Sequence, residues 1–195
     1  MRITWITALA FTTISFASCN NGGTNTGTAT NDSTAKPKES KEERNLAVIK
    51  RGMEAMNAHD IDKMKLDASP DFTEYVDGSM PPVKGDSAWA MFKQYMNAFP
   101  DTKCENTKYT ATGDWVMAYS DYSCTFKNDM MGMKATGKSC KYKDVDIFKM
   151  TEDGKVLEHR SVYPMSAMMA LCGVDMSKMP PPDAKKDMKK EKGKM

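Results

Sequence analysis

The spacing of apolar residues changes once along the chain, near Pro100, and this change decides which folds the sequence can adopt. Before it, the segment from Lys41 to Ala58 repeats apolar residues at helical spacing, and Asp86 is placed to cap a further helix that Pro100 ends. After it the period falls to two, which is typical of strands with one buried face. The predicted strands are Lys103–Thr112, Trp115–Lys127, Ser139–Met150 and Lys155–Tyr163. Helices followed by a meander of long antiparallel strands predict an α+β fold, whose curved sheet can enclose a pocket.

Shorter elements complete the expected domain. Asp60 is placed to cap a short helix that runs through Leu66, and Pro70 to Gly78 is expected to be extended. Met165 to Leu171 is either a short apolar helix or an extension of the last strand. We expect a single folded domain over residues 41–175.

The N-terminus has the features of a bacterial lipoprotein signal peptide. Arg2 precedes an uncharged apolar run, Ile3 to Phe16, which is too short to span a bilayer as an ordinary helix. The stretch Phe16-Ala17-Ser18-Cys19 resembles a lipobox, in which the Cys thiol is diacylated. We expect residues 1–18 to be a signal peptide and Cys19 to carry lipid, palmitate included, that anchors the protein to a membrane of the bacterial cell envelope. The alternative is a plain secretory signal with an incidental Cys.

Both flanks of the domain are predicted to be disordered. Residues 19–40 are mostly Asn, Gly, Thr and Ser, a composition typical of a flexible tether. Residues 176–195 form a tail that is first Pro-rich and then Lys-rich. This tail is either a solvated end or a segment that contacts anionic lipid. The formal net charge of the chain is only +2, and we expect no nucleic-acid partner.

A family resemblance rests on short motifs that occur in order along the chain. The motifs are Asn57-Ala58-His59-Asp60, Gly85, Ala98-Phe99-Pro100-Asp101, Gly132, Thr136-Gly137-Lys138, Ile147-Phe148-Lys149, Asp153-Gly154-Lys155, Val156-Leu157-Glu158-His159 and Ala170-Leu171-Cys172-Gly173. Through them, residues 45–173 resemble the SnoaL-like branch of the NTF2-like superfamily, which includes polyketide ester cyclases. The resemblance implies an NTF2-like cone, with about three helices packed in a strongly bent antiparallel sheet and a pocket at the open end.

The same resemblance implies that the cyclase chemistry has been lost. The family's acid/base position falls on Pro164, and two family His positions fall on Tyr75 and Phe126. General acid/base catalysis needs a group that titrates near the working pH, and none of these three residues has one. We therefore expect a domain that is not an enzyme. The alternative is an ester cyclase or isomerase whose acid/base has moved to Glu158, Asp144 or Asp146.

The predicted pocket depends on which face of the last strand points inward. Glu158 and Arg160 alternate on that strand and so share a face, while His159 points the opposite way. Turned inward, the pair would sit among aromatic residues, and Arg160 could clamp an anionic ligand. The alternative is an ion pair at the sheet edge. The expected pocket residues are Tyr75, Trp89, Tyr95, Tyr122, Phe126, Tyr142, Glu158 and Arg160.

Four Cys remain in the predicted domain, an even number that is compatible with disulfides in an oxidising compartment. Cys124 is expected to lie between Cys104 and Cys140 on adjacent strands. We expect a Cys104–Cys124 disulfide, with ordinary buried thiols as the alternative.

We expect no metal and no cofactor. The chain has 19 Met, some in a Met130–Met133 cluster, and soft sulfur ligands select Cu(I), but Met at helical spacing is more often core. Neither His59 nor His159 has a second ligand at useful spacing for zinc.

Three functions remain open at this point. The first is binding of a small, partly apolar ligand without turnover, in a membrane-tethered domain. The second is the cyclase or isomerase with a relocated acid. The third is an envelope scaffold that forms a homodimer through its sheet.

Overall fold

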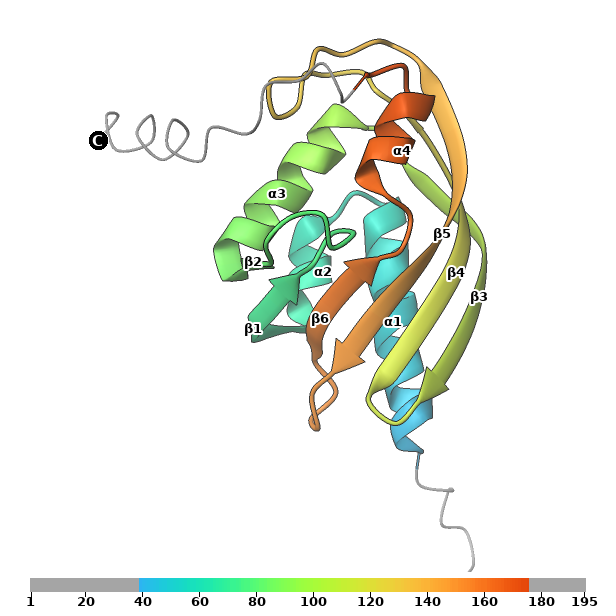
Figure 1. Ribbon diagram of the computed structural model, residues 1–195. Coiled ribbons are helices and arrows are strands. Elements are labelled where there is room, and N and C mark those ends of the chain that lie inside the picture. Colours follow the sequence, from blue (N-terminus) through green and yellow to red (C-terminus); the bar gives the residue numbers. More distant parts are fainter. Residues whose placement is uncertain (1–38, 176–195) are drawn as a thin grey trace, which may run out of the picture. The chain divides into compact units, whose positions relative to one another are not determined.

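The computed structural model describes residues 39–175, so the predicted signal peptide, Cys19, most of the tether and the basic tail lie outside the described residues. The elements in chain order are α1 (Lys41–Asn57), α2 (Ile61–Leu66), β1 (Ala68–Glu74), β2 (Val83–Lys84), α3 (Gly85–Ala98), β3 (Lys103–Thr112), β4 (Trp115–Thr125), β5 (Ser139–Met150), β6 (Val156–Ser161) and α4 (Met165–Leu171). The strands form one six-stranded sheet in the order β2-β1-β6-β5-β4-β3 (Figure 1). The predicted α+β class, with helices packed in a curled sheet, is confirmed.

Local sequence patterns predicted several element bounds correctly and missed one helix cap and two strand pairings. Strands β3 and β5 have the predicted limits, and Met165–Leu171 is a helix. Helix α3 begins at Gly85 with Lys84 as N-cap and no side-chain cap, so the predicted cap at Asp86 is wrong and Asp86 lies in the first turn. Strand β2 and the parallel pairing of β1 with β6 were not predicted, because a two-residue strand has no period and a parallel partner leaves no local signal.

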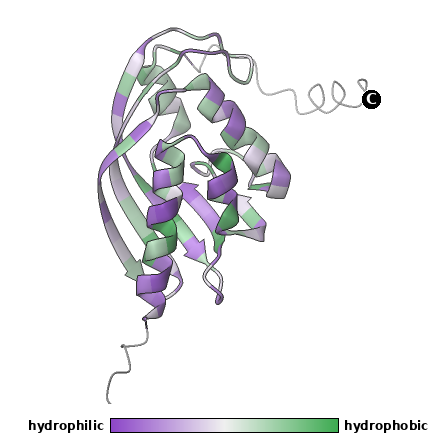
Figure 2. Cartoon of the chain, turned by 180° about the vertical axis from the view of Figure 1, so that it is seen from behind, coloured by the Kyte–Doolittle hydropathy of each residue, from purple (hydrophilic) through white to green (hydrophobic). Residues whose placement is uncertain are grey.

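The helices cover one face of the sheet. Helix α1 packs against β3 and β4, α3 packs against β1, and α4 packs against β5. Hydrophilic residues predominate on the sides of these helices that face away from the sheet (Figure 2). The buried residues form two clusters, one between α1 and the β3–β5 strands and the other at the end of α3 beneath α4. No helix within residues 39–175 is long and apolar enough to cross a bilayer.

The turn after α1 fastens that helix to the first strand of the meander. The Asn57 side chain donates from Nδ2 to the Cys104 carbonyl and accepts from the Cys104 amide at Oδ1, each at 2.8 Å. Asp60 caps α2 by accepting from the Lys63 amide at 3.0 Å, as predicted. His59 has a left-handed backbone (φ 57°), and its Nε2 lies 3.1 Å from the Thr102 carbonyl. The Asn57-Ala58-His59-Asp60 motif therefore fixes how α1 meets β3.

We expect Asn57→Ala to lower the free energy of unfolding by about 1–3 kcal/mol, because it leaves both backbone groups of Cys104 without their partner. The matched control is Asn97→Ala, since Asn97 also lies near the C-terminal end of a helix but is exposed. Urea unfolding of the two variants and the wild type measures the difference. Equal losses in both variants would show that the Asn57 bridge contributes nothing specific.

Candidate functional site

A cavity of about 130 Å³ opens between the helices and the concave face of the sheet. Its apolar wall comes from α1, α3 and α4, including Met56, Phe92 and Met165. Its polar wall comes mainly from the sheet, with Tyr95 of α3 and Tyr163 after β6, and the sheet residues are Glu74, Tyr122, Tyr142, Asp144, Asp146, His159 and Ser161. An engineered cavity of about 150 Å³ binds benzene, so this one is suited to an occupant about the size of one ring.

A second cavity of about 80 Å³ lies beside the first, between α1, α3 and the β1 end of the sheet. It is lined mainly by apolar residues, Trp89 and Phe72 among them. Asp146 and His159 line both cavities. These two side chains therefore form a polar partition between two largely apolar spaces.

His159 is held between two buried carboxylates. Its Nδ1 lies 2.6 Å from Glu74 Oε2, and its Nε2 lies 3.1 Å from Asp146 Oδ1. The Tyr122 hydroxyl donates to the other Asp146 oxygen at 2.6 Å, and the Val76 amide donates to the other Glu74 oxygen at 2.8 Å. Only 13% of the His159 side chain is exposed. Each member of this charge network is thus hydrogen-bonded on both sides.

The carboxylates decide the protonation state of His159. Burial on its own lowers the pKa of the imidazole, but the charges and hydrogen bonds of Glu74 and Asp146 outweigh it and raise the pKa to about 10. At neutral pH the ring is therefore an imidazolium, with both nitrogens donating. It stabilises two carboxylates that would otherwise be buried as like charges.

Strand register explains why these residues meet. Glu74 on β1 is the direct partner of His159 on β6 in the parallel pair. On the other side, His159 is opposite Phe148 on β5, and Asp146 lies two residues along the same face. The network therefore joins three adjacent strands, and its first member lies more than 80 residues from its last in the sequence.

Asp144 is a second buried carboxylate on the same face of β5. It accepts from the Ser161 hydroxyl at 2.5 Å and from the Tyr163 amide at 2.7 Å, which fixes the chain as it leaves β6. Burial raises the pKa of Asp144, the Ser161 hydrogen bond opposes that rise, and repulsion from Asp146 adds to it.

Stacked tyrosines form the rest of the polar wall. The rings of Tyr122, Tyr142 and Tyr163 stack in series, with centroids 5.3 and 4.9 Å apart. The hydroxyls of Tyr95 and Tyr142 lie 3.4 Å apart. Burial raises the pKa of Tyr95 to about 12 and that of Tyr142 well above its usual value. These hydroxyls are therefore neutral and can donate or accept hydrogen bonds.

Of the two placements left open for Glu158 and Arg160, the inward one is wrong and the ion pair is the one found, although β6 is an inner strand of the sheet. His159 points into the cavities, while Glu158 and Arg160 line neither of them. Glu158 is paired with Arg160 at 2.7 Å and with Lys149 at 3.4 Å, and the Arg160 guanidinium stacks on the Tyr75 ring at 3.6 Å. The alternation along the strand was predicted correctly, but the sequence did not decide which face points inward, because the partners that bury His159 lie on strands distant in sequence. An arginine clamp for an anion is thereby excluded from the cavity.

The other predicted pocket residues fall in three places. Tyr95, Tyr122 and Tyr142 line the larger cavity, as do Asp144 and Asp146. Trp89 lines the smaller one. Tyr75 and Phe126 line neither, and Phe126 is fully buried against Phe99 with ring centroids 5.1 Å apart. Sequence reasoning missed Glu74 and His159, whose only signal was an acid and a His in segments predicted to be extended.

The predicted Cys104–Cys124 disulfide is also wrong. The disulfide joins Cys140 to Cys172, and Cys104 and Cys124 are free and buried. A register shift between Glu105 and Lys108 places Cys104 opposite Tyr122, while Cys124 is opposite Cys140. Among residues 39–175, the sulfur atoms of Cys124, Cys140 and Cys172 are the group close enough to hold a metal ion.

Comparison with known proteins gives one family. The model of the family described as SnoaL-like polyketide cyclase matches residues 47–170. No curated protein sequence matches the chain.

Several solved structures are similar in fold. A protein of Jannaschia sp. CCS1 described as a SnoaL-like polyketide cyclase is 20% identical, with a TM-score of 0.64 over 75% of this chain and 100% of that one. One of Xanthomonas campestris pv. campestris described as a polyketide cyclase is 21% identical, with a TM-score of 0.61 over 68% and 99%. AclR of Streptomyces galilaeus, described as a hydroxylase, is 24% identical, with a TM-score of 0.59 over 72% and 89%.

We expect His159→Gln to lower the free energy of unfolding by about 3–5 kcal/mol at neutral pH, because two buried carboxylates lose the cation between them. The pKa of His159 rises from 6.5 to about 10 on folding, so its stabilisation is complete below pH 6.5 and is lost as the pH rises through 10. Urea unfolding at several pH values should therefore show the gap between wild type and variant closing near pH 10.

The control is His59→Gln, which removes the other His of the chain and should cost less at every pH. A gap between wild type and His159→Gln that is the same at pH 6 and pH 10 would contradict the charged state assigned to His159.

Proposed function

This chain belongs to the SnoaL-like polyketide cyclase family, and we propose that its domain binds a small, ring-sized, neutral or cationic ligand without converting it. The observation that carries the proposal is the imidazolium of His159, held between Glu74 and Asp146 at one wall of the cavity. A group with a pKa of about 10 is a weak proton donor at neutral pH and has no free base form there.

The remaining polar groups support binding over proton transfer. Asp146 already accepts from Tyr122 and His159, and Glu74 from Val76 and His159. The acid position implied by the family motif is Pro164, which is the N-cap of α4 and has no titratable group. Glu74, Asp146 and His159 are thus fixed hydrogen-bonding groups, each already engaged with the others.

Charge and size define the ligand class. The network of Glu74, His159 and Asp146 carries a net charge of −1 when both carboxylates are ionised, and Asp144 lies beside it. This charge would repel an anion, and Arg160, which could have held an anionic ligand, lies outside the cavity. The apolar wall and the volume of about 130 Å³ favour a single ring that bears a hydroxyl or an amine.

The proposal predicts a specific order of affinities for simple probes. Phenol and benzylamine should bind and raise the free energy of unfolding, by about 2.7 kcal/mol at a concentration one hundred times Kd, whereas benzoate should not. Filling the cavity by Met91→Trp should abolish the effect, because Met91 lines it. The control Met117→Trp, at an exposed position, should retain it. Thermal and urea unfolding measure both.

Binding of benzoate as tight as that of benzylamine would refute the ligand class. If none of the probes binds and no small molecule is carried by protein purified from its own host, the scaffold function takes the place of ligand binding. That function is favoured by the exposure of Met117 and Tyr119, at 38% and 41%, on β4.

A relocated acid is the second candidate function, and Asp144 is the observation that favours it. It is buried, its hydrogen bonds come from the Ser161 hydroxyl and from backbone amides, and its pKa is raised. Glu158, in contrast, is paired with Arg160 and Lys149 outside the cavity and is not retained as a candidate. Turnover of a cyclic ester or ketone that is abolished by Asp144→Asn, with the fold intact, would replace binding by catalysis.

We also propose that the domain is tethered to a membrane of the cell envelope through lipid on Cys19. The sequence Phe16-Ala17-Ser18-Cys19 supports this, and acyl chains contribute about 0.8 kcal/mol per buried CH₂ group. In the host, Cys19→Ser should move the protein from the membrane fraction to the soluble fraction. Cys104→Ser is the control and should leave it in the membrane fraction, since Cys104 is buried in the domain. If Cys19→Ser also stays in the membrane fraction, the protein is not anchored by lipid on Cys19.

A further inference from the structure

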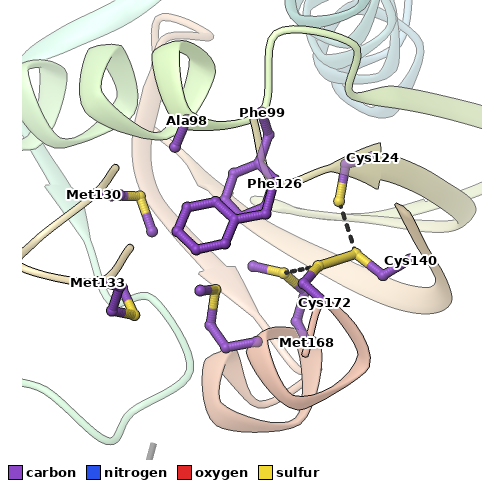
Figure 3. Packing of buried hydrophobic residues seen from close by; sticks show 10 residues of the cluster. Ala98, Phe99, Cys124, Phe126, Met130, Met133, Cys140, Met168 and Cys172 are labelled. Atoms are coloured by element: carbon purple, nitrogen blue, oxygen red, sulfur yellow. Dashed lines mark hydrogen bonds between the residues drawn. A yellow bond between two sulfur atoms is a disulfide. The ribbon is translucent and has the colours of Figure 1, made fainter. Parts of the chain in front are cut away.

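The core cluster beneath α4 is rich in sulfur. Seven of its ten buried residues carry a sulfur atom, three of them Cys and four Met, and the other three are Ala98, Phe99 and Phe126 (Figure 3). Leu, Ile and Val, the usual residues of such a core, do not occur among the ten. The proposed function uses none of the three Cys.

The three Cys come from separate elements and converge. Cys124 lies on β4, Cys140 lies opposite it on β5, and Cys172 caps the C-terminal end of α4. Their sulfur atoms all lie within 4.8 Å of one another, and Cys124 Sγ is 3.0 Å from Cys140 Sγ. A thioether completes the group, because Met168 Sδ is 3.9 Å from Cys172 Sγ. Figure 3 shows these side chains directed toward one another.

A structural disulfide explains only part of this arrangement. The bond between Cys140 and Cys172 uses two sulfur atoms and leaves the Cys124 thiol directed at them. Burial raises the pKa of Cys124 to about 12, so the thiol is neutral and a poor nucleophile for disulfide exchange. A metal ion gives the third sulfur a role, because coordination deprotonates a buried thiol.

We propose that, once the Cys140–Cys172 bond is reduced, this cluster binds one Cu(I) ion through Cys124, Cys140 and Cys172, with Met168 as a further soft donor. Thiolate and thioether ligands select Cu(I), while Mg²⁺ and Ca²⁺ require oxygen. Zinc is held by Cys, His and carboxylates rather than by thioethers. The proposal revises our expectation from sequence that the chain has no metal site, and it uses a set of residues that Met counts alone did not indicate.

The chemistry balances with an added phosphine reductant. One phosphine and one water convert the Cys140–Cys172 disulfide into two thiols, and the phosphine leaves as its oxide. Cu(I) then replaces the proton of each thiol that coordinates it, and these protons go to solvent without a change in the oxidation state of copper. Affinity should therefore rise with pH.

The test uses the full-length chain with Cys19→Ser, so that the N-terminal thiol cannot contribute. The protein is reduced with tris(2-carboxyethyl)phosphine under argon and titrated with Cu(I) in competition with bicinchoninate. We expect one Cu(I) per chain and only sulfur neighbours in the X-ray absorption spectrum. The oxidised protein should bind none, because two of the ligands are then joined.

Matched variants separate the site from other thiols. Cys124→Ala and Cys172→Ala should each weaken Cu(I) binding by at least about tenfold. Met168→Leu should weaken it less, because the thioether is only a further donor. Cys104→Ala is the control, since Cys104 is equally buried but lies in the other cluster, and it should bind as the parent does. Circular dichroism and the unfolding midpoint establish that each variant is folded.

Three results would overturn the proposal: no retention of Cu(I) by the reduced protein, an equal loss in Cys104→Ala, or Zn²⁺ bound as tightly as Cu(I). The copper site and the ligand cavity are tested independently, because Cys124→Ala should bind phenol and benzylamine as the parent does. A failure of the copper site therefore does not decide the proposed function.

Discussion

The charge of His159 is the interaction on which the inner face of the sheet depends. Glu74 and Asp146 lie within hydrogen-bond reach of one imidazole, and without its positive charge they would be buried like charges. The three residues come from β1, β5 and β6, so the same ion network that sets the polarity of the cavity also ties together the part of the sheet where pairing changes from antiparallel to parallel. If the domain binds the ligand we propose, its stability and its ligand specificity depend on the same atoms.

That shared role limits the chemistry of the site. A catalytic acid or base must change its proton within each cycle, whereas the stability of this sheet needs His159 to keep its proton. The family model matches residues 47–170, and in this chain Glu74, Asp146 and His159 are engaged with one another on the inner face of the sheet. Asp144 is held by the chain that leaves β6, so a change in its charge would also act on that segment. Fold resemblance at 20–24% identity is compatible with this divergence.

Sequence patterns predicted what depends on neighbours along the chain. Helical spacing, alternation and turn residues identified the α+β class and the bounds of β3 and β5, and motif order identified the family. They did not predict which side of β6 faces inward, because Glu158-His159-Arg160 is polar throughout and alternation without an apolar residue has no preferred face. The partners that decide the question, Glu74 and Asp146, lie on strands whose pairing has no local signature. The disulfide was missed for a related reason, because Cys172 lies at the end of α4 and reaches Cys140 through the packing of this helix on β5 rather than through strand pairing.

Helix α4 connects the larger cavity with the sulfur-rich core cluster. Met165 and Met168 on this helix line the larger cavity, and Cys172 at its end is bonded to Cys140 on β5. The covalent bond holds the C-terminal end of this seven-residue helix to the sheet. The segment before the helix is held by the hydrogen bonds of Asp144 to the chain after β6. The wall of the cavity formed by α4 is thus fixed at both ends. A helix of seven residues has little stability of its own. These two attachments, rather than helix propensity, therefore hold α4 in place as a wall of the cavity.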